Sequence, residues 1–275
     1  MDDVLRKLQL TQLDMLKAVD AFCRENGVRY SLFGGTLLGA VRHQGFIPWD
    51  DDLDICMSRK DYDRFLSLWA QTKHPGLILQ NKENTPTFTQ SFTKIRKDNT
   101  AFVQADWEAG LYHNGIFIDI FPIDRIPDGR LARYLFRWRC MRYQLYTREF
   151  VPEENGLFLK AGSRLLLALT PKKSRARARQ DLLKKITARD DDRTLSPIGI
   201  EVFRSLNRPY PVDMLENYVE LPFEDMTCSC FAQWDEMLRR IYGDYHRLPS
   251  ESERTWRHHP VVLSFEHNYE DLKKD

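Results

Sequence analysis

The sequence contains few cysteines and no long hydrophobic run. Its longest aliphatic run covers residues 165–169 and is far too short to span a bilayer. The first residues, Met-Asp-Asp-Val, have neither the basic start nor the apolar stretch of a secretory signal peptide. Five cysteines at irregular spacings predict reduced thiols and argue against a zinc site. We therefore expect a cytoplasmic protein.

The chain also lacks a strong net charge, but its charges are unevenly distributed. The 275 residues include 41 Lys and Arg and 40 Asp and Glu, for a formal net charge of +1. Residues 125–189 hold seventeen basic residues against five acidic ones, so this segment carries +12 and the remainder −11. Such a basic segment either binds an anionic partner or is a solvated face that balances the charge of the acidic remainder.

Apolar periodicity and turn residues predict a chain of both helices and strands. Helices are expected over residues 2–26, from Thr36 to about Arg42, after Ser58, across residues 128–189 and over residues 231–242. Strands are expected at residues 28–33, 47–57, 77–80, 88–96, 101–104 and 116–121. The pattern indicates an α+β (α/β-like) body with a basic helical insertion.

Four aspartates crowd into residues 50–54. Because side chains alternate along a strand, Asp50, Asp52 and Asp54 would share one face. Asp51 would lie on the opposite, buried face together with its apolar neighbours. Hard oxygen ligands at this density suit Mg²⁺ or Mn²⁺, which also bind phosphate oxygens.

Two further features point to phosphate chemistry at this cluster. The preceding turn, Gly34-Gly35-Thr36, opens a helix whose backbone N–H groups can hold a phosphate. Asp119 interrupts an otherwise apolar strand, where a lone carboxylate is costly to bury, so it is the best candidate for a third metal ligand. The alternatives are a solvated acidic loop and, for Asp119, a core aspartate paired to an arginine.

Four segments resemble the LicD family of phosphocholine transferases, which includes fukutin-related proteins. They are GGTLLGAVRHQGFIPWDDDLDI, TKIRKDNT, FIDIFPID and IYGDYHRLPSESERTWRHH. The resemblance implies a nucleotidyltransferase core of the polymerase-β type with a mixed sheet. It also implies that Asp52 and Asp54 are paired metal ligands and Asp119 the third. Asp50 would be a supporting group or a base.

The resemblance further implies a reaction. A phospho-alcohol such as phosphocholine would pass from a CDP-linked donor to a sugar hydroxyl, releasing CMP. The acceptor would be a cell-surface glycan such as teichoic acid or lipopolysaccharide, or its lipid-linked precursor. Two Mg²⁺ (or Mn²⁺) ions would offset the charge of the diphosphate.

Several cationic side chains are candidates for contacts to this donor or acceptor. Lys94 and Arg96 lie one strand period apart and would point the same way, and Arg42 lies near the end of the helix that follows the glycine turn. His258 and His259 fall in the C-terminal segment of the resemblance. Each of the five is alternatively a surface residue.

The basic middle predicts an anionic membrane surface as a partner. Residues 130–143 interleave five arginines with aromatic and aliphatic residues, and KKSRARAR follows at residues 172–179. Such a helix can lie on anionic lipid. No nucleic-acid recognition motif is present, so nucleic acid is not expected as a partner. A solvated face that balances the acidic body is the alternative. The membrane interpretation places the protein at the inner face of the membrane.

The expected organisation is a catalytic core at residues 1–127, a basic helical insertion at 128–195 and a C-terminal part at 196–275 that completes the site. Two other functions fit the same residues. One is a nucleotidyltransferase that passes NMP to a small molecule and releases pyrophosphate. The other is a non-catalytic module that binds cations or membranes.

Overall fold

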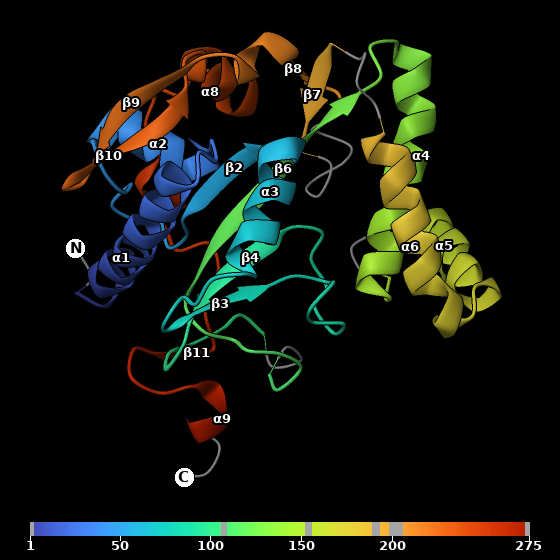
Figure 1. Cartoon of the computed structure of the whole chain (residues 1–275), viewed down its shortest axis with the longest axis horizontal. Helices are drawn as coiled ribbons and strands as arrows, with labels where there is room; N and C mark the ends of the chain where they lie inside the picture. The colour runs from blue at the N-terminus through green and yellow to red at the C-terminus, as the bar shows by residue number, and fades with distance from the viewer. Residues whose placement is uncertain (1–2, 106–108, 152–155, 189–192, 198–205, 273–275) are drawn as a thin grey trace. The chain divides into compact units, whose positions relative to one another are not determined.

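The computed structural model describes residues 3–105, 109–151, 156–188, 193–197 and 206–272 (Figure 1). The chain divides into two compact units. One comprises residues 1–80, 93–122 and 213–275, and the other comprises residues 81–92 and 123–212.

The first unit is built on a mixed sheet with the strand order β1-β2-β6-β4-β3. The strands are β1 (Ser31–Leu32), β2 (Asp54–Ser58), β6 (Phe117–Ile126), β4 (Thr93–Lys97) and β3 (Leu77–Gln80). The pairs β1–β2, β6–β4 and β4–β3 are antiparallel, whereas the arrows of β2 and β6 point the same way in Figure 1. The predicted α+β class and mixed sheet are therefore confirmed.

Three helices in the N-terminal part of this unit follow the sequence pattern. Helix α1 (Asp3–Glu25) buries its apolar stripe and is followed by Gly27, whose φ is +58°. Helix α2 (Gly34–His43) begins two residues before the expected Thr36. Helix α3 (Arg59–Trp69) starts after Ser58, whose side chain accepts a hydrogen bond from the backbone N–H of Asp61, as an N-cap does.

The strand predicted at residues 47–57 is wrong for its first half. Only Asp54–Ser58 forms β2, and the three preceding aspartates lie in a loop. The carbonyls of Ile47, Asp50 and Asp51 accept hydrogen bonds from side chains of α1, so they bond to that helix rather than to a neighbouring strand. Two other strands are also shorter than predicted, since β1 keeps only two residues and β4 starts at Thr93. The strand predicted at residues 116–121 is longer, because β6 continues past Pro122 to Ile126.

The C-terminal part of the first unit returns to the same core. The 3₁₀ helix η2 (Val212–Leu215) leads into the hairpin of β9 (Tyr218–Phe223) and β10 (Met226–Phe231). Helix α8 (Trp234–Tyr242) starts three residues later than expected, because Phe231 still belongs to the hairpin. The chain then continues through η3 (Glu251–Glu253), β11 (Val262–Ser264), which pairs with β5 (Ala101–Val103), and α9 (Tyr269–Leu272).

The second unit contains the arginine-rich helices that the sequence predicted. They are α4 (Arg130–Arg148), α5 (Leu157–Leu169) and α6 (Lys172–Thr187). Its core joins Phe136, Cys140 and Tyr143 of α4 to Leu182 and Ile186 of α6. The end of β6 pairs with β7 (Thr194–Ser196), which pairs with β8 (Tyr210–Pro211). None of the helices in the described ranges combines the length and apolarity that crossing a membrane requires.

Candidate active site at a cluster of buried aspartates

Two glutamines of α1 hold the loop that carries the aspartates. Gln9 donates through Nε2 to the carbonyls of Ile47 (3.2 Å) and Asp50 (2.9 Å). Gln12 donates to the carbonyls of Asp51 (3.1 Å) and Phe117 (3.2 Å). Both glutamines are fully buried, so each bond forms away from water, where an unpaired carbonyl would be costly. The loop therefore has a fixed position between α1 and the start of β6.

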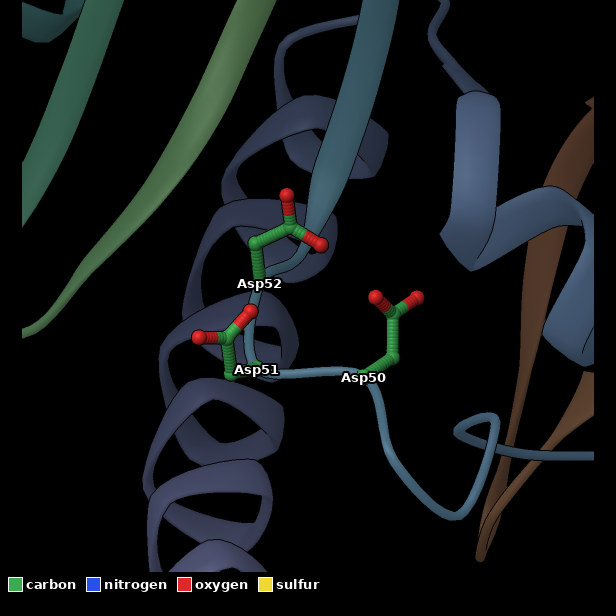
Figure 2. A group of neighbouring side chains, drawn as sticks. All are labelled: Asp50, Asp51 and Asp52. Carbon is green, nitrogen blue, oxygen red and sulfur yellow. The ribbon is translucent and has the colours of Figure 1, made fainter. Parts of the chain in front are cut away.

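Three carboxylates from this loop lie close together (Figure 2). Asp50, Asp51 and Asp52 each offer one oxygen, and these atoms all lie within 4.8 Å of one another. Burial raises the pKa of Asp50 well above its ordinary value, and the charge of Asp52 raises it further. Burial also raises the pKa of Asp54 well above its ordinary value, with added contributions from Asp52, Asp119 and Asp50. The carboxylates of the loop, of β2 and of β6 thus repel one another.

The glycine turn lets the start of α2 approach these carboxylates closely. A Cβ on Gly35 would lie 2.5 Å from Oδ2 of Asp50, and a Cβ on Gly34 would lie 3.1 Å from Oδ2 of Asp54. Gly34 also has a φ of +54°, which favours glycine. Thr36 accepts a hydrogen bond from the backbone N–H of Asp54 at 2.8 Å. The positive end of the helix dipole therefore lies beside two acidic side chains and partly offsets their charge.

Asp51 has a different environment from its neighbours. It is fully buried, as the alternation of faces predicted, and it accepts hydrogen bonds from the backbone N–H groups of Arg257 (3.2 Å) and His258 (2.9 Å). Its Oδ1 also lies 3.1 Å from Nδ1 of His258. Burial opposes the charged form, but these hydrogen bonds outweigh burial and lower the pKa of Asp51. Because its oxygens already have partners, Asp51 anchors the C-terminal segment rather than offering a free ligand.

The same segment brings cations to the cluster. Nε2 of His258 lies 3.8 Å from Oδ2 of Asp52. Burial opposes its charged form, yet Asp51 and Asp52 raise the pKa of His258. His259 is exposed and adopts a φ of 40°, and no contact brings it to the carboxylates in the described part of the chain. Of the two predicted histidines, the structure places His258 at the site.

Lys94 and Asp119 form a buried ion pair across β4 and β6. Nζ of Lys94 lies 2.6 Å from Oδ1 of Asp119, at directly opposite positions of the two strands. Nζ also lies 3.3 Å from the centre of the Phe117 ring. Burial lowers the pKa of Lys94, and Asp119 opposes that shift. The sequence alternative for Asp119 was an arginine partner, and the structure gives it a lysine instead.

The two predicted arginines make contacts of different kinds. Arg96 is buried and donates to Oε1 of Gln80 (2.8 Å) and to the carbonyl of Gly115 (2.9 Å), so it holds strands and loop together. Arg42 donates to the carbonyl of Tyr245 at 3.0 Å. Burial lowers the pKa of Arg42, while the charge of Asp50 raises it, which indicates that its guanidinium lies within electrostatic reach of the cluster.

Comparison with known proteins identifies the domain around this cluster. Residues 27–148 match the family model described as LicD/FKTN/FKRP, nucleotidyltransferase domain. The chain carries a LicD-family domain. It is similar to the lipopolysaccharide cholinephosphotransferase LicD of Haemophilus influenzae, with 29% identity over 92% of this chain and 96% of that protein. The resemblance read from the motifs is therefore confirmed.

Other relatives match shorter parts of the chain. An uncharacterized protein of Rickettsia typhi is 36% identical over 48% of this chain and 43% of its own length. The human ribitol 5-phosphate transferase FKRP is 57% identical over 35 residues, which are 13% of this chain and 7% of that protein.

The LicD-family domain offers a donor set that fits a hard divalent cation. Several buried carboxylates repel one another, and a divalent ion with oxygen ligands would offset that repulsion. Among the described residues, the predicted ligands Asp52, Asp54 and Asp119 do not gather within 4.8 Å of one another, whereas Asp50–Asp52 do. The predicted ligand set therefore stays a prediction.

Two residues near the aspartates, Arg257 and Tyr242, were not predicted as site residues from the sequence. Arg257 retains solvent exposure, and although partial burial opposes its charge, Asp50 raises its pKa. The hydroxyl of Tyr242 would lie 3.9 Å from a Cβ on Gly34. The available signals were the position of Arg257 directly before His258 and the place of Tyr242 at the end of the helix expected over residues 231–242.

Proposed function

We propose that this chain is a metal-dependent transferase that moves phosphocholine or a similar phospho-alcohol from a CDP-linked donor to a sugar hydroxyl, with release of CMP. The acceptor in this proposal is a cell-surface glycan or its lipid-linked precursor. The similarity to a cholinephosphotransferase over nearly the whole chain supports the reaction type. The order of elements supports a polymerase-β-like core: a glycine turn opens a helix, the paired aspartates follow it, and Asp119 lies on the adjacent strand.

The observation that carries the proposal is the under-compensated charge of Asp50, Asp52 and Asp54. Their pKa values are raised by burial and by neighbouring aspartates, so the cluster favours added positive charge. Asp52, Asp54 and Asp119 are the residues that would hold Mg²⁺ or Mn²⁺. When bound, such ions would neutralise the diphosphate and stabilise the attacking and leaving oxygens of an in-line displacement.

The chain's own residues would bind the donor and move the proton. The sugar oxygen forms a bond to the distal phosphorus while the bond from that phosphorus to the CMP oxygen breaks, and the hydroxyl proton passes to a base. We assign this proton to Asp50, because a carboxylate with a raised pKa is a better base near neutral pH. Arg257, beside Asp50 and open to solvent, would bind donor phosphate oxygens.

A donor screen tests this function. The purified protein is incubated with CDP-choline, CDP-ribitol or a nucleoside triphosphate, with a glycan acceptor, in the presence of EDTA or of added Mg²⁺ or Mn²⁺. We expect CMP release from a CDP-linked donor, its loss in EDTA and its return with metal. Pyrophosphate from the triphosphate would instead support a nucleotidyltransferase, and the absence of both products would support a non-catalytic module. Full turnover in excess EDTA would contradict the metal mechanism.

A pair of variants ties the activity to the cluster. Asp52→Asn keeps the shape of the side chain but removes a charge from the site. Asp14→Asn makes the same chemical change on the exposed surface of α1. Turnover should fall only in the first variant, and equal turnover in both would contradict the assignment of the site.

A further inference from the structure

Helix α4 has an apolar face that the described part of the second unit does not cover. Its buried side packs Phe136, Cys140 and Tyr143 into the core. Another side exposes four large apolar or aromatic side chains, namely Leu131 (74%), Tyr134 (50%), Leu135 (63%) and Trp138 (48%). Their spacing of three, four and seven residues puts them on one stripe of the helix. A contiguous apolar stripe of this kind marks an interaction surface.

A cationic cavity adjoins this stripe. It has a volume of about 560 Å³ and is lined by Arg130, Arg133, Tyr134, Arg137, Leu206 and Asn207. Arg137 donates to Oδ1 of Asn207 at 2.6 Å, and Arg133 donates to the carbonyl of Asp128 at 3.1 Å. The stripe and the cavity share Tyr134, so apolar and cationic groups form one surface.

The neighbouring helices α5 and α6 also expose apolar and basic side chains. Helix α5 exposes Leu165 (60%) and Leu169 (71%), and α6 exposes Lys172, Lys173 and Arg177. Two other charges of the segment 172–179 have internal partners instead. Arg175 donates to the carbonyls of Thr170 and Leu167, and Arg179 forms an ion pair with Glu83 at 2.7 Å. The basic segment therefore has fewer outward charges than its sequence suggests.

We propose that the exposed face of α4 docks on the surface of an anionic lipid bilayer. Leu131, Leu135 and Trp138 enter the boundary between headgroups and acyl chains, and the arginine cavity takes lipid phosphates. Charge complementarity favours this occupant, because the segment 125–189 carries a net charge of +12. A nucleic acid would satisfy the arginines but leave the leucines in water. The inference rests on the second unit alone and is independent of the proposed transferase activity.

Vesicle sedimentation tests the docking. The full chain is mixed at low salt with two kinds of vesicle. One contains phosphatidylcholine alone, and the other also contains about 30% phosphatidylglycerol, an anionic lipid. We expect binding to the anionic vesicles that weakens as salt rises, and little binding to the neutral ones. Arg130→Gln with Arg133→Gln should weaken binding about 25-fold, because each charge near the surface contributes about a factor of five. Equal binding to both vesicle types would overturn the proposal.

A matched pair of variants tests the apolar stripe. Leu131→Ser removes an exposed side chain from the stripe, and Leu10→Ser removes one that is 44% exposed on α1. The first should weaken binding about tenfold, since a leucine entering an apolar medium is stabilised by at least that factor. The second should leave binding unchanged. Equal effects of the two variants would refute the placement of the docking face.

Fluorescence quenching locates the tryptophan. Anionic vesicles with brominated acyl chains should quench part of the protein's tryptophan emission, and Trp138→Phe should lose that part while still sedimenting with the vesicles. Unquenched Trp138 in a bound protein would show purely electrostatic adsorption and overturn the insertion. Tighter binding to a duplex RNA than to anionic vesicles would also overturn it, in favour of a nucleic-acid partner.

Discussion

Asp51→Asn is the sharpest perturbation of the site's architecture. The two carboxylate oxygens of Asp51 accept from two backbone N–H groups, those of Arg257 and His258, and one of them also lies at hydrogen-bond distance from the His258 ring. Asparagine has the same shape but replaces one acceptor oxygen by a donor NH₂ group. Whichever way the amide lies, one backbone N–H group loses its acceptor and faces a donor.

The expected cost follows from these contacts. A hydrogen bond to a charged acceptor contributes about 1.5–3 kcal/mol, and a buried donor left without an acceptor costs about 1–3 kcal/mol. The neutral amide is cheaper to bury than a carboxylate, which offsets part of this loss. We therefore expect the segment that carries Arg257 and His258 to be held about 2 kcal/mol less tightly, which is roughly a 30-fold change in its opening equilibrium.

Hydrogen–deuterium exchange measured by mass spectrometry can follow that opening directly. Peptides covering residues 251–260 should exchange about 30-fold faster in Asp51→Asn than in the unmodified protein, whereas peptides from α3 should not change. Asp14→Asn is the matched control, because Asp14 is exposed on α1. Turnover should fall as well, because Arg257 and His258 would lose their positions. Exchange in residues 251–260 within about threefold of the unmodified protein would refute the anchoring role.

Three further predictions concern other parts of the first unit. Asp52→Asn should lower CMP release by about a thousandfold, yet leave the metal-free protein as stable as before or more so in urea denaturation, because one repelling charge is removed. Gly35→Ala should destabilise the protein by about 1–3 kcal/mol in the same assay, since its Cβ would lie 2.5 Å from Asp50, whereas Gly162→Ala, with open space around its Cβ, should not. Hydrogen bonds from Arg6 lower the pKa of Glu224. The ionised Glu224 therefore stabilises the folded state fully above the ordinary glutamate pKa of about 4.3, and this stabilisation is lost as the pH falls through the lowered pKa. In Glu224→Gln, the urea midpoint should fall less steeply as the pH is lowered from about 6 to 3 than it does in the unmodified protein. The same pH dependence in both proteins would contradict this assignment.

The features that the sequence predicted well depend on local rules. Helical periodicity located α1 and α3, and a serine with an N-cap geometry marked the start of α3. The alternation of side chains along a strand predicted that Asp51 is buried. Asp51 is buried, although it lies in a loop rather than in a strand. Asp50, which the alternation placed with Asp52 on the other face, is buried as well, and oxygens of all three aspartates lie within 4.8 Å of one another. The burial of Asp51 was therefore predicted, but a separation of the aspartates onto two faces was not observed.

The features that the sequence did not predict depend on contacts between distant residues. Arg257 lies next to Asp51 only because the C-terminal segment returns to the core, more than 200 positions later in the chain. Gln9 and Gln12 fix the acidic loop, but their partners are backbone carbonyls, which leave no trace in the side-chain pattern. One signal was available, since both glutamines lie on the buried side of α1, where an amide without a partner would be costly.

The contrast between neighbouring aspartates is the strongest physical argument for a functional cluster. Asp51 is as buried as any residue in the loop, yet hydrogen bonds lower its pKa, and Asp119 has a lysine at 2.6 Å. Asp51 shows how the fold stabilises an acidic group whose role is structural, and Asp119 shows how a single cation can partner a carboxylate beside the cluster. Asp52 and Asp54 are partly buried, and desolvation together with neighbouring aspartates raises their pKa values more than His258 and Lys94 lower them. The contrast with Asp51 supports our proposal that a cation binds at Asp52 and Asp54, which the family resemblance assigns to metal together with Asp119.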